Sequence, residues 1–500
     1  SEAKTAIIMP ICNEDVHTVF ANLRAIGESL LQTEARTVSA LFILSDSSKP
    51  ETQESERLAA THLRAAFQNK LEIYYRHRTV RSRKKAGNVA DFCRRWGQLY
   101  RYMVVLDADS LMTGSAITEL IKTMEARPNI GILQTAPQPC GMNTWHGRIL
   151  QVASQLPGQL FTRGMAYWQQ GESHYWGHNA ILRIAPFMNH CALSRLPGQG
   201  GLSGEILSHD FVEAALMRRA GFEIWLLPHI EGSYEQPPAN LLEELQRDRR
   251  WCQGNLKNLR LIAEPGLTPT HRMMLLTGGL AYLSAPLWLT LLVVGMLLQA
   301  LNPHHILHFF TLSNAYYSLP LWGITLAILF LPRGLAVANV LIQRQQSHFG
   351  GKRHLFFSAA GETFFAAIQA PIKMVAHSYF VLVALTGLEI SWKSPARTVQ
   401  SLTWNDWSQR LTPFITPIFA LCFMTLWLAP LSALWVAPLL IPAIIIIPFG
   451  VWTSRLQPEE TWNGVFSSQN DHQIPDIVIH SNSHHSLLNL LTTTQTIGTN

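Results

Sequence analysis

Charged residues are distributed very unevenly along this 500-residue chain. Residues 1–272 contain 30 Lys and Arg and 26 Asp and Glu, which is 56 charges, whereas residues 273–500 contain the remaining 9 and 7, which is 16. Apolar runs in the second part approach the roughly 20 residues that a helix needs to cross a bilayer. We therefore expect a polar domain at 1–272 and membrane helices at 273–456, which excludes a wholly water-soluble protein and a small disulfide scaffold.

Six apolar runs are candidates for membrane spans: Met273–Leu298, Tyr316–Leu331, Leu355–Ala370, Met374–Ile390, Pro413–Leu428 and Trp435–Trp452. The third and fourth are short and are interrupted by Glu362 and Lys373. Basic residues fall between every second span, so three hairpins would place these residues and the polar domain on the cytoplasmic side. Residues 333–349 have apolar residues at helical spacing and a Gln/Arg face, which is typical of a helix in the membrane interface.

Three other segments have a biased composition. Residues 142–176 are rich in Trp and Gln, and they and the basic helix at 239–263 are candidates for contact with the bilayer surface. Residues 457–500 are rich in Ser, Thr, Asn and His, and we expect them to be poorly ordered. The chain begins with Ser1, which is compatible with missing upstream segments.

Net charge and cysteine usage narrow the possible functions. The formal charge of +6 divides into +4 and +2 between the two parts, which is too small to indicate nucleic-acid binding. The six cysteines include no C-x-x-C pair, so neither a zinc site nor a redox motif is expected. Free thiols in the polar part suit a reducing cytoplasm.

The polar part alternates buried strands with amphipathic helices, which indicates an α/β sheet. The strands are expected at Thr5–Ile11, Val38–Leu44, Leu71–Tyr75, Tyr102–Leu106 and Ile130–Gln134, and the helices at Val16–Leu31, Glu56–Phe67, Asn88–Leu99 and Ala116–Glu125. Ligands of such sheets bind beyond the carboxyl ends of the strands. Neither the dinucleotide-binding nor the P-loop glycine pattern occurs.

Carboxylates follow two of these strands. Asp107 and Asp109 come directly after a buried strand and can turn toward one point, where they could share a divalent cation that carries a diphosphate. Asp46 ends another strand and could accept hydrogen bonds from a nucleoside. Each acid by itself is equally compatible with a solvated turn.

Lys84–Asn88 precedes a helix and contains Lys85 and a glycine, which together favour an anion site at a helix start. Basic residues also precede this segment, and we expect them to form a solvated basic face: Arg76, Arg78, Arg81 and Arg83.

Two later helices carry polar residues suited to catalysis. Ser208 is a candidate N-cap for the helix over Val212–Arg219, and either Asp210 or His209 in its first turn could act as a general base. Asn240–Ile262 is helical by periodicity.

The second of these helices contains Arg247, Arg250 and Trp251, which its periodicity places on one face. Arginine beside tryptophan suits a pyrophosphate next to a sugar ring, although the helix taken by itself fits a basic membrane-surface helix better. Trp176 and His178 flank a glycine in an aromatic segment of the kind that sugars bind.

These features follow one another in a fixed order: a strand-end Asp, K-A-G-N, D-x-D, an aromatic-Gly segment, an Asp-bearing helix start, an R-x-x-R-W helix and membrane spans. This order resembles the processive, inverting glycosyltransferases of family 2, such as cellulose and hyaluronan synthases. The stretches MPICNEDV, GNVADFCRRWG, MVVLDADS, GESHYWGHNAI, LSHDFVEAALMRRAGF and RDRRWC are similar, nearly letter for letter, to the bacterial members that make osmoregulated periplasmic glucans.

The resemblance implies a GT-A type fold that uses UDP-glucose and Mg²⁺ or Mn²⁺, with a growing β-linked glucan as the acceptor. It implies a bacterial inner-membrane protein with a cytoplasmic catalytic domain, and it allows an acyl carrier protein as a further partner. Asp46 matches the family's uridine-contacting acid and Lys85 a phosphate-contacting lysine. Asp107 and Asp109 match the acids that hold the nucleotide sugar and its metal.

The resemblance also implies roles on the acceptor side. Asp210 matches the base of the family's T-E-D motif, which reads S-H-D here. Arg250 and Trp251 match the end of the Q-x-x-R-W motif, whose Gln is replaced by Arg247 in this chain. The segment Trp176–His178 would lie near the acceptor end.

Two other functions fit the same features. One is a family 2 enzyme that glycosylates a lipid phosphate. The other is a non-enzymatic transporter or channel with a nucleotide-sensing domain, for which the charged Glu362 and Lys373 inside the predicted spans are the argument.

Overall fold

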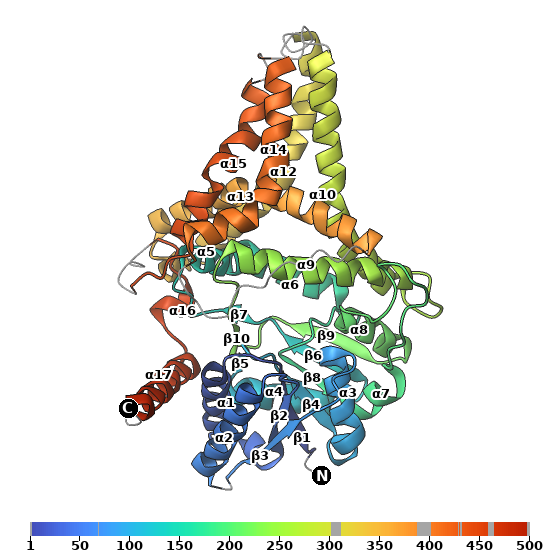
Figure 1. Cartoon of the computed structure of the whole chain (residues 1–500). Coiled ribbons are helices and arrows are strands. Elements are labelled where there is room, and N and C mark those ends of the chain that lie inside the picture. Colours follow the sequence, from blue (N-terminus) through green and yellow to red (C-terminus); the bar gives the residue numbers. More distant parts are fainter. Residues whose placement is uncertain are drawn as a thin grey trace.

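The structure, a computed structural model, describes residues 3–68, 70–301, 312–387, 402–428, 430, 433–458 and 465–497. Figure 1 shows an α/β domain at the base, a layer of helices across the middle and upright helices above them. The N-terminus lies at the base beside β1, far from the upright helices.

Seven strands form the central sheet in the order β3-β2-β1-β4-β8-β6-β9. Their bounds are β1 Thr5–Ile11, β2 Ser39–Ser45, β3 Glu72–His77, β4 Tyr102–Val105, β6 Ile130–Thr135, β8 Ala180–Arg183 and β9 Glu223–Leu227. Neighbouring strands are parallel, except that β8 runs antiparallel to both β4 and β6. The predicted α/β class is confirmed, and all five predicted strands are present with ends shifted by no more than one or two residues.

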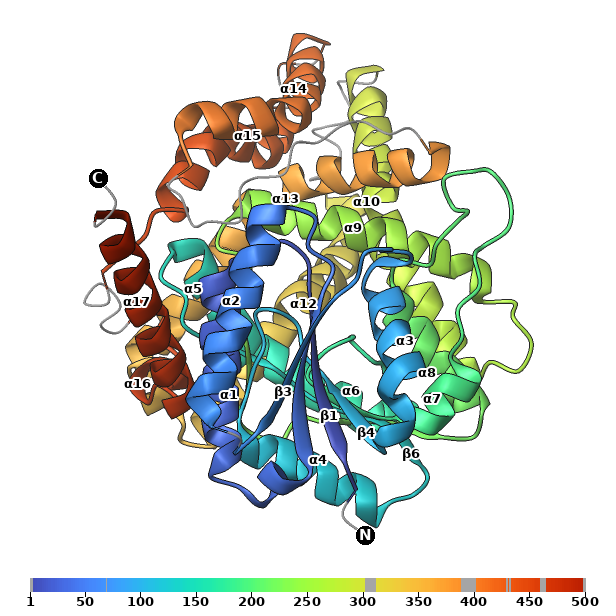
Figure 2. The same cartoon turned by 60° about the horizontal axis from the view of Figure 1, so that its bottom comes forward.

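Helices cover both faces of this sheet (Figure 2), namely α1 Val16–Leu31, α2 Pro50–Phe67, α3 Lys84–Trp96, α4 Gly114–Ala126, α7 Ile184–His190 and α8 His209–Arg219. The alternation along β1 explains why two layers are needed: Ile7 and Met9 pack with α1, α2 and α4, whereas Ala6 and Ile8 pack with α3, α7 and α8. A strand that is buried on both faces reads as a continuous apolar run, which is why the sequence located it so well.

A smaller sheet and three helices lie between this domain and the upright helices. The strands β5 Leu111–Met112, β10 Ser233–Glu235 and β7 Gln138–Pro139 pair in that order. The helices are α5 Trp145–Ala153, α6 Gln159–Gln169 and α9 Leu241–Asn258, and a π-helical turn at Ser154–Gly158 joins the first two. The N-cap of α9 is Asn240, whose side chain accepts the backbone N–H of Glu243 at 3.0 Å.

Within the described residues, five helices are long and apolar enough to cross a membrane, close to the expected six. They belong to α10 Pro269–Leu301, α12 Leu312–Ile342, α13 Lys352–Thr386, α14 Trp404–Leu428 and α15 Ala433–Thr453. The expectation of separate spans at Leu355–Ala370 and Met374–Ile390 is wrong, because α13 runs without a break through both; residues 388–390 lie outside the described part.

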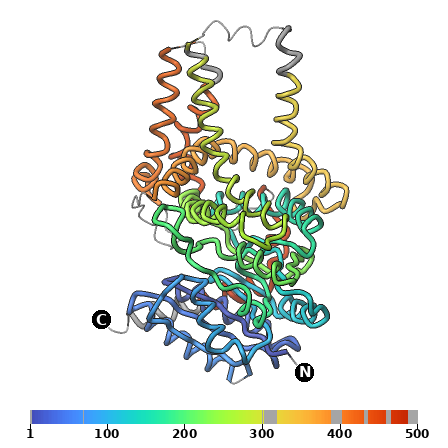
Figure 3. The backbone as a smooth tube through the Cα atoms, turned by 90° about the vertical axis from the view of Figure 1, so that its right-hand side faces the viewer, coloured from blue at the N-terminus to red at the C-terminus, as the bar shows by residue number. Residues whose placement is uncertain are grey.

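Helix α13 also differs from the others in its surroundings. Figures 1 and 3 show it lying across the base of the upright helices, next to α9. Half of its most apolar stretch (50%) is buried inside the protein, against 17% to 33% in the other four helices. Apolar length alone therefore misled the sequence analysis, since much of this helix faces protein.

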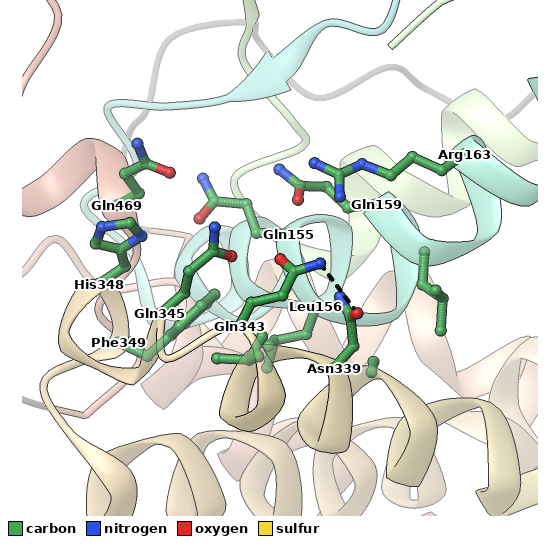
Figure 4. A pocket seen from close by; sticks show the side chains of 13 residues that line it. Gln155, Leu156, Gln159, Arg163, Asn339, Gln343, Gln345, His348, Phe349 and Gln469 are labelled. Carbon is green, nitrogen blue, oxygen red and sulfur yellow. Dashed lines mark hydrogen bonds between the residues drawn. The ribbon is translucent and has the colours of Figure 1, made fainter. Parts of the chain in front are cut away.

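The segment 333–349 differs from the interfacial helix that we expected. Its first ten residues are the C-terminal part of α12, and a short 3-10 helix, Gln346–Phe349, follows. Arg333 donates two hydrogen bonds to the carboxylate of Glu362 on α13, at 2.7 and 2.9 Å. Gln343 and Gln345 line an amide-rich pocket against the π-helical turn and α6 (Figure 4) and are also exposed. Contact of this segment with the membrane interface stays a prediction.

Buried polar contacts join α9 to α13. Lys373 Nζ donates to Glu244 Oε1 at 2.7 Å, and His377 Nε2 lies 2.9 Å from Asp248 Oδ2. His146 on α5 approaches the other oxygen of Glu244 at 3.3 Å. Burial alone would raise the pKa of Glu244, but His146 and Lys373 hold it well below its usual range. These buried polar contacts thus hold α9 against α13.

The expectation of a poorly ordered tail at 457–500 is wrong for most of its described part. Residues 469–472 form the short helix α16, and Asp476–Ile497 form α17, which packs on α1 at the side of the α/β domain (Figure 1). Ile477 and Val478 are buried in the same core as α1. Ile477 and Val478 lie in a segment rich in Ser, Asn and His, so its composition did not predict that it packs on α1.

The α9–α13 charge pairs predict a specific stability effect. Lys373→Ala would leave the buried Glu244 with His146 as its remaining partner, and we expect a loss of about 3 kcal/mol in the free energy of unfolding. Lys352→Ala, at an exposed position on the same helix, should change it by no more than about 0.5 kcal/mol. Urea unfolding in detergent measures both, and equal effects of the two substitutions would contradict the importance of the pair.

Candidate active site

The D-x-D acids lie where the strand-end rule predicts, directly after β4. The Lys85 ammonium, from the first turn of α3, forms an ion pair with the Asp107 carboxylate. The same ammonium donates a hydrogen bond to the backbone carbonyl of Gly177 at 2.8 Å. One lysine therefore links the D-x-D loop to the aromatic-Gly segment 70 residues later in the chain.

The antiparallel strand β8 explains why that segment reaches the D-x-D loop. Val105 of β4 pairs with Ala180 of β8. Two residues further in each direction, the register brings Asp107 opposite His178. His178 Nε2 also lies 3.7 Å from Glu235 Oε2, at the end of β10. The site thus gathers side chains from both sheets.

Asp210 reaches the same place from the first turn of α8. Gly177 has a backbone φ of +89°, and a Cβ at this position would lie 3.2 Å from Asp210 Oδ2. Only glycine adopts this conformation readily and leaves the carboxylate uncovered. Charges on Lys85 and His209 both act on Asp210, and burial raises its pKa.

Ser208 precedes α8 as predicted, but its side chain does not cap the helix. Its backbone carbonyl instead accepts a hydrogen bond from Asn258 on α9 at 2.9 Å. At Gly254, also on α9, a Cβ would come within 2.9 Å of the Ser208 backbone nitrogen. This close approach locks the start of α8, and hence Asp210, against α9.

His209, the other candidate base, is already engaged. Its Nδ1 lies 3.0 Å from Glu213 Oε1, one turn along α8. Burial alone would lower the pKa of His209, but the Glu213 carboxylate raises it above the usual value. Because Glu213 already occupies one ring nitrogen of His209, the geometry favours Asp210 as the base.

The two D-x-D carboxylates have opposite pKa shifts. Burial alone would raise the pKa of Asp107, but the Lys85 ammonium holds it below its usual range. Burial and the charge of Asp107 together raise the pKa of Asp109 to about 6. The repulsion that raises the pKa of Asp109 would equally favour a divalent cation between the two acids.

The donor set fits Mg²⁺ or Mn²⁺ only together with a substrate. Among the described residues there is no cluster of three or more Asp, Glu, His or Cys side chains placed to hold a metal. Two carboxylates completed by diphosphate oxygens and water are an ordinary arrangement for these cations. Asp107 and Asp109 can therefore hold a metal that a nucleoside diphosphate brings with it.

Helix α9 contributes Arg247 and Trp251, which lie one turn apart. The Arg247 guanidinium stacks over the Trp251 ring at 4.5 Å from its centroid, and the indole remains 49% exposed. Arg247 is also close enough to lower the pKa of Glu235, which burial raises. Arg250 is exposed on the helix surface. The charge of Arg247 thus acts on the Glu235 carboxylate.

Two family models match the chain. Residues 6–190 match glycosyl transferase family 2, and residues 102–332 match glycosyl transferase family group 2. Together they assign residues 6–332 to glycosyltransferase family 2. The GT-A type fold that the sequence implied for the polar domain is confirmed by these matches and by the mixed sheet.

Curated relatives in family 2 are similar over most of this chain. A protein named glucans biosynthesis glucosyltransferase H from Ralstonia nicotianae is 45% identical over 465 residues, and one of the same name from Cupriavidus pinatubonensis is 46% identical over 465 residues. Both alignments cover 91% of this chain and 54% of the relative, so the chain spans about half the length of the relatives it matches.

Solved structures with similar folds include a mannosyltransferase from Pyrobaculum calidifontis in complex with GDP-Man and Mn²⁺. It is 15% identical to this chain, with a TM-score of 0.44, and the match covers 73% of this chain and 88% of that one.

The surroundings of Asp46 and of the basic residues near it differ from expectation. Asp46 is only 5% exposed, and Arg78 donates to both of its oxygens, at 2.9 and 2.6 Å. Arg76 likewise donates to Asn88 Oδ1 at 2.8 Å. The solvated basic face is therefore wrong for these two arginines, while Arg81 is exposed as expected. Contact between Asp46 and uridine stays a prediction.

The anion site expected at Lys84–Asn88 also changes. Helix α3 begins at Lys84, so Gly87 lies inside the first turn and donates its N–H to Arg83 O at 3.0 Å. A Cβ at Gly87 would clash with the Ser82 carbonyl at 2.0 Å, which explains the glycine by packing. Lys85 remains the anion-facing group of this segment.

Trp176 lies beside the site without joining the acids. Its backbone N–H donates to Gln134 Oε1 on β6 at 2.9 Å, which fixes the aromatic-Gly segment to the sheet. Sequence reasoning missed Glu235, Glu213 and Arg78. Glu235 lies on a strand of only three residues and Arg78 pairs with an acid 32 residues away, so neither has a local signal. The i,i+4 spacing of His209 and Glu213 on one helix is a signal that could have indicated their contact.

The opposite pKa shifts in the D-x-D pair can be tested in the metal-free protein. Asp109 should titrate near pH 6, Asp107→Asn should lower that midpoint by removing a negative charge, and His178→Ala should raise it by removing a positive one. Infrared difference titration of protein labelled with ¹³C-aspartate measures the midpoint. A shift in the same direction for both variants would rule out this electrostatic account.

Proposed function

We propose that this chain is the catalytic and membrane part of a processive, inverting glucosyltransferase. It transfers glucose from UDP-glucose to a growing β-linked glucan and passes the glucan across the bacterial inner membrane. The observation that carries the proposal is the convergence of Asp107, Lys85 and Asp210 around Gly177. The names of the curated relatives favour glucan synthesis over other family 2 reactions.

The donor side supplies charge stabilisation. Asp107 and Asp109 would hold a divalent cation, which as a Lewis acid offsets the negative charge on the departing UDP. Lys85 would then contact a phosphate oxygen in place of the Asp107 carboxylate. Its ammonium has three N–H groups and already contacts both Asp107 and the Gly177 carbonyl at this edge of the sheet. Arg247 is placed to face the same region, and Arg250 follows three residues further along α9.

The acceptor side supplies the base. Asp210 would accept the proton of the acceptor hydroxyl, which attacks the anomeric carbon from the face opposite UDP. Its raised pKa makes Asp210 a stronger base than an ordinary aspartate, while His209 is engaged by the Glu213 carboxylate. A single displacement converts an α-linked donor into a β-linked product. Trp251 offers an exposed aromatic face for the acceptor sugar.

The arrangement of helices suits export. We propose a cytoplasmic catalytic domain at residues 1–272 and a membrane region at 273–456. Helix α9, which carries Arg247 and Trp251, packs against α10 and α13 at the base of the upright helices, so the acceptor end would face them. The charges that favoured a transporter are paired, Glu362 with Arg333 and Lys373 with Glu244, so transport is not needed to explain them.

The direct test uses radiolabelled UDP-glucose with the purified protein in lipid. A polymer that lengthens with time supports the proposal, because processivity requires the acceptor to remain bound. A labelled glycolipid would instead indicate transfer to a lipid phosphate, and no transfer at all, with nucleotide bound, would indicate a sensing domain. Linkage analysis of the product identifies the glucan, and an acyl carrier protein partner stays a prediction.

The assignment of the base predicts the behaviour of two neighbouring variants. Asp210→Asn should lower the transfer rate by at least about 100-fold, since it removes general-base catalysis, and leave UDP affinity within about twofold. His209→Gln should lower the rate by less than about tenfold. Rates and UDP titrations measure both effects, and the larger loss falling on His209→Gln would reverse the assignment.

The metal role predicts a change in affinity. Asp109→Ala should weaken UDP binding in Mn²⁺ by at least about tenfold and leave UDP binding in chelator unchanged, because one of two metal ligands is lost. Glu231→Ala, at an exposed acid, is the matched control. Calorimetry with and without Mn²⁺ measures the difference, and full metal-dependent affinity in Asp109→Ala would exclude this carboxylate as a ligand.

A further inference from the structure

Helix α17 is part of the same core that lies under the active-site edge of the sheet. It runs alongside α1 in both Figure 1 and Figure 2. Ile477 and Val478 pack in one buried cluster with Ile11 at the end of β1 and Leu106 at the end of β4. Helix α17 also contacts β5, which begins two residues after Asp109, so it packs against the strand that directly follows the D-x-D loop.

A hydrogen-bond chain continues from this helix to the loop itself. Ser481 Oγ donates to Asn22 Oδ1 on α1 at 2.6 Å. Asn22 Nδ2 in turn donates to the carbonyl oxygen of Ala108 at 3.2 Å. Ala108 is the residue between the two D-x-D aspartates. Ser481 is 6% exposed and Asn22 is 5% exposed, so water competes little for either bond.

The chain fixes which end of the Asn22 amide faces the loop. A carboxamide can turn over, and then its oxygen would face the Ala108 carbonyl, oxygen against oxygen. The Ser481 hydroxyl donor prevents this by holding Oδ1 on the other side. Without that hydroxyl, the buried amide loses the partner that orients it, and the Ala108 peptide loses a defined donor.

A second polar contact secures the helix further along. His484 Nε2 lies 2.8 Å from Glu28 Oε2 on α1, and Arg24 holds the other oxygen of Glu28 at 3.0 Å. Apolar burial, a hydrogen bond and an ion pair thus fasten α17 to one face of α1. The hydrogen bond is the one that leads to the metal-holding loop.

We propose that α17 is a strap that positions the D-x-D loop, with Ser481 and Asn22 as positioning residues that set the affinity for the divalent cation and its nucleoside diphosphate. The inference rests on the proposed role of Asp107 and Asp109. It assigns to the polar segment after the membrane helices a part in donor binding that its sequence does not suggest.

The test compares two serines two residues apart on α17. Ser481→Ala removes the bond to Asn22, whereas Ser483 is exposed and its hydroxyl bonds only to the Ile479 carbonyl of its own helix, at 2.8 Å. In calorimetry with UDP and Mn²⁺, Ser481→Ala should weaken metal-dependent UDP binding by about 2- to 10-fold, the range of one hydrogen bond. Metal-independent UDP binding and the Tm should match those of Ser483→Ala.

Two further variants separate positioning from packing. Ser481→Thr keeps the hydroxyl and should restore wild-type affinity. Asn22→Leu should weaken metal-dependent binding, and adding Ser481→Ala to it should cause no further loss, because both act through one chain. Equal behaviour of Ser481→Ala and Ser483→Ala, or independent losses in the double variant, would overturn the inference.

The controls also distinguish this inference from the proposed function. If Asp109→Ala keeps metal-dependent UDP binding, then the metal role fails and the strap has no loop to position. If Asp109→Ala loses it while Ser481→Ala binds like wild type, then the metal role stands and the strap alone is wrong.

Discussion

The ammonium of Lys85 holds the candidate site together. It pairs with Asp107 and donates to the carbonyl of Gly177, so a single cation joins a loop after β4 to the segment before β8. Without it, the Asp107 carboxylate would lose its counter-charge and the segment carrying His178 would lose the hydrogen bond at Gly177. Asp210 depends on the same arrangement, because its carboxylate lies against the glycine that Lys85 holds.

Helix α9 extends this organisation toward the membrane. One side locks the start of α8 through Gly254 and Asn258, and another presents Arg247 and Trp251. Its remaining side pairs with α13 through Glu244 and Asp248. A displacement of α13 would therefore shift both Asp210 and the Trp251 ring, because all three sets of contacts belong to the single helix α9.

The parts of the fold that the sequence could predict are those with strong local signals. Strand β1 was located to the residue because burial on both faces leaves an unbroken apolar run, and Asp107 followed from the end of β4. Two spans were predicted where the single helix α13 is present, and this has a physical cause. Hydropathy measures apolar content and does not distinguish a helix that contacts lipid from one that contacts protein.

Partnerships between distant residues were beyond the sequence. Asp46 was placed correctly at a strand end, but its pairing with Arg78 depends on how β2 and β3 align. Glu235 lies on a strand of three residues that only the second sheet defines. Ser481 gives no local sign that it reaches Asn22, 459 residues earlier.

The reversed direction of β8 has a consequence for how such proteins can diversify. Because this strand enters the sheet at the ligand edge and leaves at the opposite edge, its preceding loop is constrained by chemistry and its following segment is not. Arg183, at the far rim, donates to the Ile130 and Met124 carbonyls, and α7 begins at the next residue, so changes there would act on packing and stability. Changes in the loop before β8 would act on the candidate site directly. The single inverted strand thus separates a side of the domain that carries the candidate site from a side that carries packing alone.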